Sequence, residues 1–197
     1  MTMDRGLRTA VLIVAFLNLA YFGVEFIVAL SIGSVSLLAD SVDFLEDTSV
    51  NLLIFFAMAW TATTRARVGM AMAAILLIPA LAFLWSLWTK FSQPVPPDPF
   101  TLSVTGLGAL GVNLVCALIL TRFRSHRGSL TRAAFLSARN DAFANVAIIC
   151  AGLVTAYVWR SIWPDVLVGL AIAVLNIGAA KEVWEAARDE HDAIARS

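Results

Sequence analysis

Long apolar segments separated by short polar ones repeat along the whole chain. A helix needs about 20 mainly apolar residues to cross roughly 30 Å of hydrocarbon. The pattern therefore predicts an all-α membrane protein, a six-transmembrane-helix bundle that forms a single domain, 1–197, with no soluble domain. The predicted spans are 9–31, 36–60, 68–89, 100–121, 132–158 and 164–186.

Composition supports a multi-pass protein embedded in the lipid bilayer. Of the 197 residues, 60% are hydrophobic and only 14% are charged, which is far from the balance of soluble proteins. The formal net charge is zero, so no basic field suggests a nucleic-acid partner. The first segment follows Arg5 and Arg8 as a secretory signal would, but it is too long and contains Glu25, so we expect a retained helix.

Basic residues predict the orientation, because Lys and Arg are retained preferentially on the cytoplasmic side. Of the two sides, one carries eleven basic residues and the other only Lys90 and Arg160, while Arg139 lies within the fifth span. We therefore expect both termini in the cytoplasm, and the cytoplasmic (inner) membrane as the location in a bacterium. The eleven are Arg5, Arg8, Arg65, Arg67, Arg122, Arg124, Arg127, Arg132, Lys181, Arg188 and Arg196.

The second span carries four acids within eight positions, Asp40, Asp43, Glu46 and Asp47. Each ionised acid costs on the order of 2.5–3.5 kcal/mol at the centre of a spanning helix, so some interaction must offset them. At 100° per residue Asp40, Asp43, Asp47 and Asn51 share an arc of about 80°, with Glu46 at its edge. Asp40 alone is equally explained as an interfacial residue, whereas Asp47 lies roughly 16 Å deep.

The fifth span carries a second polar face. Ser137, Asp141 and Asn145 follow one another at four-residue steps, Asn140 flanks them, and Asp141 lies about 15 Å from the cytoplasmic entry. The two faces can meet at mid-membrane, with no histidine and no cysteine on either, which predicts an oxygen-lined cation site suited to Mn²⁺, Fe²⁺ or Mg²⁺. The predicted metal ligands are Asp43, Asp47, Asp141 and Ser137, with Asn140, Asn145 and Asp40 as accessory ligands.

Other interpretations of the polar residues stay open at this point. Protonated acids could instead form an interhelical hydrogen-bond cluster without any metal. Asn18 and Glu25 on the first span could line the same cavity or tie that helix to a neighbour. Asn113 and Asn176 are expected to pack helices together, and Cys116 and Cys150 lie inside spans, where a structural disulfide is not expected.

These residues together resemble the cation diffusion facilitator family of divalent-metal transporters. The resemblance rests on Asn18 and Glu25, on GSVSLLADSVDFLED, on the Asp141 and Asn145 face, and on WPD before the sixth span. It implies efflux of a divalent metal ion by alternating access in exchange for protons, a homodimer, and no cofactor, the metal being the substrate. It maps the family's ligands onto Asp43, Asp47, Ser137 and Asp141.

Two departures accompany the resemblance. Zinc-transporting members usually carry His where this chain has Ser137, which disfavours zinc. The family commonly carries a cytoplasmic C-terminal domain, and we expect the form that lacks it.

Three rival functions follow from the same residues. The chain could be a non-transporting membrane subunit derived from a transporter, or a proton-coupled transporter of another cation. An intramembrane hydrolase could use two carboxylates as acid and base, but no Ser–His pair or Gly-flanked acid supports it, so we expect no enzyme.

Overall fold

The structure is a computed structural model that describes residues 5–56, 75, 78, 80–122 and 129–176, with the side chains of 129–139 outside this description. All secondary structure in these ranges is helical. The all-α class predicted from the sequence is therefore confirmed.

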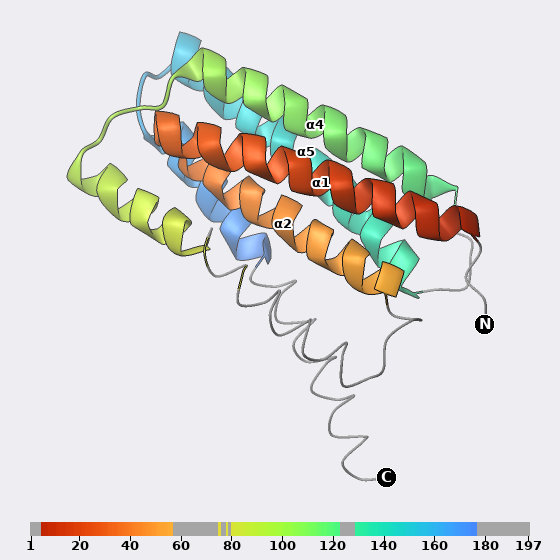
Figure 1. The fold of residues 1–197 in the computed structure, drawn as a ribbon. Helices are drawn as coiled ribbons and strands as arrows, with labels where there is room; N and C mark the ends of the chain where they lie inside the picture. The colour runs from red at the N-terminus through yellow and green to blue at the C-terminus, as the bar shows by residue number, and fades with distance from the viewer. Residues whose placement is uncertain (1–4, 57–74, 76–77, 79, 123–128, 177–197) are drawn as a thin grey trace.

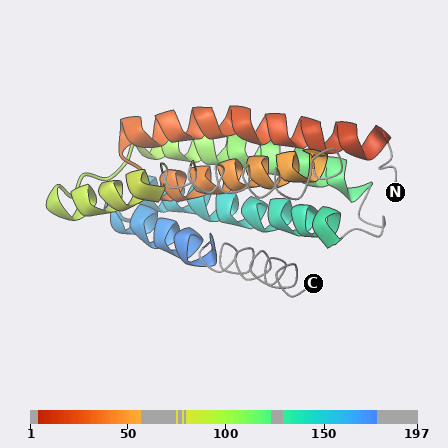
Figure 2. The same cartoon turned by 60° about the horizontal axis from the view of Figure 1, so that its bottom comes forward.

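Four long helices form the bundle: α1 (Arg5–Ile32), α2 (Val35–Phe56), α4 (Pro99–Thr121) and α5 (Ser129–Tyr157). They lie side by side along a common direction (Figure 1). α1 packs against α2 and α4, and α5 packs against the same two helices, so the four close a ring. A helix over 80–92 and another over Trp163–Asn176 flank this ring; Figure 2 shows the latter, in blue, beside α5 on the side away from α1.

A two-residue turn makes α1 and α2 antiparallel neighbours. Gly33 adopts a φ of 63°, the left-handed conformation that glycine accepts without a Cβ clash and that commonly ends a helix. The Ser34 amide donates to the Ala29 carbonyl at 2.9 Å, which satisfies one of the last carbonyls of α1. The acids of α2 are thereby held against α1.

The proline-rich segment before α4 ends in a helix cap. The Asp98 carboxylate accepts from the Thr101 amide at 2.8 Å and from the Thr101 hydroxyl at 2.6 Å. These hydrogen bonds hold the pKa of Asp98 below its usual value. Pro99 follows in the first turn, where its missing N–H costs nothing, so the sequence DP fixes where α4 begins.

Apolar and polar side chains are distributed in the reverse of a water-soluble protein. Large apolar side chains cover the outside of the bundle, whereas many polar ones are buried inside it. Exposed examples are Phe16, Ile27, Leu107, Leu118 and Phe143. Buried examples are Asn18, Glu25, Asp40, Asn113, Asn145 and Asp165. The exterior is therefore suited to lipid.

Helix length and composition agree with a membrane location. Among the described residues three helices are long and apolar enough to cross a bilayer, Gly6–Ile32, Pro99–Thr121 and Asn140–Tyr157, and Trp163–Asn176 is a shorter apolar helix. α2 is excluded from this group by its four acids. The six-span count and the cytoplasmic termini stay predictions, because most of 57–79 and all of 177–197 lie outside the described residues.

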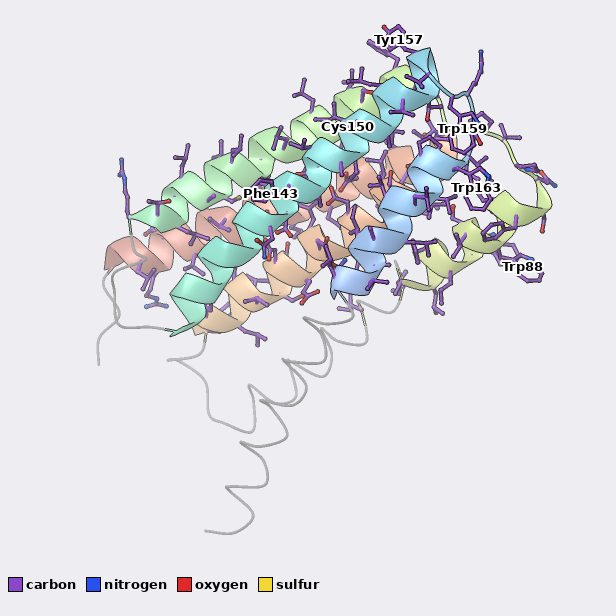
Figure 3. All side chains as sticks on the ribbon, turned by 180° about the vertical axis from the view of Figure 1, so that it is seen from behind. Trp88, Phe143, Cys150, Tyr157, Trp159 and Trp163 are labelled. Carbon is purple, nitrogen blue, oxygen red and sulfur yellow. The ribbon has the colours of Figure 1, made fainter. Side chains whose placement is uncertain are left out.

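Aromatic side chains gather at one end of the bundle. Figure 3 shows Trp88, Trp159, Trp163 and Tyr157 at the end of α5 and beside the helix that follows it, and all four are exposed. Trp and Tyr settle at the boundary between lipid and water. This end is therefore suited to one membrane interface, with the turn at Gly33 at the same end of α1 (Figure 1).

At this end a single carboxylate joins α2 to the helix Trp163–Asn176. Asp165, fully buried, accepts from the hydroxyls of Ser34 and Ser36 at 2.7 and 2.6 Å. It also accepts from the backbone amides of Val35 and Ser36 at 2.8 and 3.1 Å, which are unpaired donors at the start of α2. We call these four contacts the Asp165 clamp.

A close helix approach supports the Asp165 clamp. Gly169 lies one turn after Asp165, and a Cβ placed there would come within 2.9 Å of the Ser36 amide nitrogen. Only glycine permits this distance without movement of the backbone. Lys90, from the helix over 80–92, is buried within electrostatic range of Asp165 and donates to the Val95 carbonyl at 2.6 Å.

Asp165→Ala is expected to lower the free energy of unfolding by roughly 3–5 kcal/mol, because two buried amides and two hydroxyls lose their acceptor. Asp165→Asn keeps one acceptor oxygen and should lose less. The thermal unfolding midpoint in detergent measures both. Asp98→Ala, which removes an exposed cap, is the matched control and should shift the midpoint least; equal shifts for all three variants would contradict the assigned role of the Asp165 clamp.

Candidate functional site

The polar face of α2 points into the bundle. Asp40, Asp43, Asp47 and Asn51 have exposed fractions of 0, 9, 7 and 1%, whereas Glu46 is half-buried at the edge of that face. α1 and α5 cover this face, because both pack against α2. The helical spacing in the sequence thus places four polar side chains in the interior of the bundle.

Around Asp47 three helices meet. The Asn18 amide group from α1 donates to Asp47 Oδ2 at 3.4 Å, and Cys116 Sγ from α4 donates to Asn18 Oδ1 at 3.5 Å. Asn51 donates to the Asp47 carbonyl one turn along α2, at 2.8 Å. Asn18 is therefore a polar partner of the acidic face, one of the two roles considered for it.

Cys116 corrects one sequence-based inference. The absence of cysteine from the acidic faces was wrong, because Cys116 is buried next to Asn18 and lies within electrostatic range of Asp47 and Asp141. The signal in the sequence was the buried stripe of α4 at steps of three and four residues. That stripe comprises Thr105, Ala109, Asn113, Cys116 and Leu120. A thiol consequently belongs to the inventory of polar groups around the acids.

Asp43 faces the acid of the fifth helix. Of the charged groups that act on Asp43, Asp141 acts most strongly, ahead of Asp40, Glu46 and Asp47. Asp141 is half-buried on α5. Ser137 lies one turn earlier in α5, and its side chain is outside the described residues. The structure therefore brings the carboxyl groups of α2 and α5 into electrostatic contact.

The accessory candidates lie in two different places. Asn145, fully buried on α5, donates to Asp40 Oδ2 and accepts from the Asn113 amide group of α4 at 2.9 Å. Asn140 is exposed and borders a groove of about 340 Å³ between α5 and the helix Trp163–Asn176, together with Phe143. Asp40 and Asn145 are thus engaged with each other.

No three His, Cys, Asp or Glu side chains of the described ranges converge closely enough to hold a metal ion. Asp43, Asp47 and Asp141 are electrostatic neighbours, but a metal would require their oxygens to come closer by side-chain rotation or helix movement. The ligand set stays a prediction. In chemical terms the cluster offers hard oxygen donors that can bind a cation only when ionised.

A family model described as the cation efflux transmembrane domain matches residues 11–189. The chain belongs to the cation efflux family. The match covers nearly the whole chain and includes every helix described above, so the resemblance inferred from the sequence is confirmed. No curated protein matches the chain closely enough to count as a relative.

Membership of the cation efflux family identifies a membrane protein of cation transport. The buried acids of α2 then lie in the interior of a transport domain, as the function of this family requires. Glu25 of α1, whose role the sequence left open, is fully buried and acts electrostatically on Asp40.

The hydrogen bond between Asn113 and Asn145 should be measurable by a double-mutant cycle with alanine at both positions. In membrane proteins such bonds average about 0.6 kcal/mol, so a coupling energy between about 0.5 and 1.5 kcal/mol is expected. Thermal or denaturant unfolding in detergent gives the four free energies. A cycle between Asn113 and the exposed Asn140 serves as the control and should show no coupling.

Proposed function

We propose that this cation efflux domain exports a divalent metal ion from the cytoplasm by alternating access, in exchange for protons. The observation that carries the proposal is the electrostatic contact between Asp43 of α2 and Asp141 of α5, with Asp47 one turn from Asp43. Uncompensated acids of this kind inside a membrane bundle are costly, and they mark ion pathways. The protein acts as a homodimer in the cytoplasmic membrane.

Exchange with protons follows from the chemistry of the ligands. Closely spaced carboxyl groups in a dry interior repel one another when ionised, so the empty site retains protons. A divalent ion binds only to the ionised groups and therefore displaces those protons. A proton gradient across the membrane can then drive release of the metal on the opposite side.

The donor atoms indicate which metals are carried. Carboxylate oxygens from Asp43, Asp47 and Asp141, with Ser137 as a fourth oxygen, favour Mn²⁺, Fe²⁺ or Mg²⁺ over softer ions. The thiol of Cys116 lies nearby but already donates to Asn18. We therefore assign the substrate to the harder divalent ions.

Two rival functions predict different behaviour. A non-transporting subunit with a dead site would release no protons when Mn²⁺, Fe²⁺, Co²⁺ or Zn²⁺ is added to the purified protein. A proton-coupled transporter of another cation would show a pH-dependent activity that divalent metals do not inhibit. The proposed function requires both proton release and metal uptake.

Asp47→Ala and Asp141→Ala should each reduce metal uptake by reconstituted vesicles to the level of protein-free vesicles, because each removes one of three charged ligands. Uptake is measured for Mn²⁺, Fe²⁺, Co²⁺ and Zn²⁺ with and without a pH gradient. Asp98→Ala, which removes an exposed acid outside the bundle, should transport as the unaltered chain does.

Unfolding would mimic loss of transport, so each variant is first checked for its elution volume and thermal midpoint in detergent. Folded Asp47→Ala or Asp141→Ala protein with normal metal uptake would exclude the site. A pH gradient, inside acidic, should increase uptake by the unaltered chain several-fold; uptake that ignores the gradient would exclude the exchange.

A further inference from the structure

A second pair of carboxyl groups lies in the bundle outside the predicted metal ligands. Glu25 of α1 and Asp40 of α2 are both fully buried. Among the described residues neither Glu25 oxygen has a hydrogen-bond donor, and Asp40 Oδ1 has none either. The fourth oxygen, Asp40 Oδ2, accepts from Asn145. Three of four carboxyl oxygens are thus buried without a donor.

The two carboxyl groups face each other as hydrogen-bonding neighbours. An ionised carboxylate only accepts hydrogen bonds, so two ionised groups cannot bond to each other and instead repel. The other ionisable groups that act on the pair are also acidic: Asp43 and Asp47 on α2, and the Tyr21 hydroxyl on α1, which donates to the Thr105 carbonyl. The partners from α4 and α5, Asn113 and Asn145, are neutral.

We propose that Glu25 and Asp40 form a proton-binding site, separate from the metal ligands, in which one proton is shared between the two carboxyl groups. The bound proton turns one carboxyl group into a donor toward the other. One negative charge then remains, and the Asn145 amide group stabilises it at Asp40 Oδ2. The unpaired oxygens of Glu25 and Asp40 thereby gain a partner.

A proton fits this pair better than a metal ion does. Divalent ions in proteins require four to eight ligands, whereas the described surroundings of Glu25 and Asp40 supply two carboxyl groups and no further acid, His or Cys that completes a ligand group. A proton requires only two oxygens. The number of donor atoms therefore selects the smaller cation.

The proton site deepens the proposed function and rests on it for its coupling. Asp43 acts electrostatically on Glu25, and Asp47 acts on Asp40. A divalent ion held by Asp43, Asp47 and Asp141 brings two positive charges within range of the pair, so the pair can ionise fully. Metal binding thus expels a proton from a site that does not touch the metal.

Infrared spectroscopy of the purified full chain in lipid nanodiscs tests proton occupancy without metal. The difference spectrum between the unaltered chain and Glu25→Gln should show a protonated carboxylic C=O band that shifts in D₂O. Asp98→Asn, an exposed carboxylate at the same pH, is the control and should show no such band. Absence of the band from the Glu25→Gln difference spectrum overturns the proposal.

Calorimetry in two buffers of different ionisation heat then counts protons released per Mn²⁺ or Co²⁺ bound. Glu25→Gln should bind the metal and release fewer protons, by about one per metal, because a glutamine amide donates to Asp40 permanently. If Glu25→Gln does not fold, Asp40→Asn provides the same donor from the other side. An unchanged proton count in a folded variant overturns the coupling.

Failure of the two proposals is distinguishable. If the protonated carboxylic band is present but no divalent ion binds to the unaltered chain or removes the band, the metal function fails and the proton site stands. If the metal binds, while the band is absent and Glu25→Gln releases as many protons as the unaltered chain, the proton site fails and the metal function stands.

Discussion

Buried carboxyl groups without water to solvate them impose the constraint on which this bundle depends. In hydrocarbon no solvent molecule can pair with an ionised oxygen, so each acid must find its partner on another helix. Asp47 has Asn18 of α1, Asp40 has Asn145 of α5, and Asp165 has the start of α2. These pairings run between helices, and each therefore also fixes how two helices are rotated relative to each other.

The acids of α2 divide into two environments along one face. Asp40 and Asp47 are seven residues apart, about 10 Å along the helix axis. Near Asp40 the partners are amide side chains that form a chain from α5 to α4, and an unpaired glutamate. Near Asp47 the partners are an asparagine and a thiol, and Asp141 lies within range. One helix can therefore hold a proton and a metal ion at different heights, coupled only by charge.

Much of this arrangement was accessible from the sequence. Apolar segments longer than a bilayer is thick predicted the helices, and the 100° rotation per residue predicted that Asp40, Asp43, Asp47 and Asn51 share one face. Cys116 was missed for a physical reason. α4 is apolar nearly all round, so its sequence does not specify which side faces the interior, and only packing against α1 and α5 decides it.

The Asp165 clamp was missed for a different reason. In the sequence Asp165 is one acid after a Trp–Pro pair near an expected span boundary, where a solvated carboxylate would be unremarked. Its significance depends on Ser34 and Ser36, some 130 positions earlier in the chain. Contacts of such separation cannot be inferred from local spacing, whereas the helix cap by Asp98 three residues before Thr101 can.

The two ends of the bundle are held together by different forces, and this difference bears on transport. At the aromatic end the Asp165 clamp joins α2 to its neighbour through four hydrogen bonds that lipid cannot replace. At the opposite end Leu7, Val11, Ile54 and Leu120 pack through apolar contacts. Lipid chains are as apolar as leucine, so these helices can exchange contacts with lipid at little cost. Movements that open the acidic interior are therefore favoured at the end where α1 begins, while the Asp165 clamp holds the other end of α2 in place.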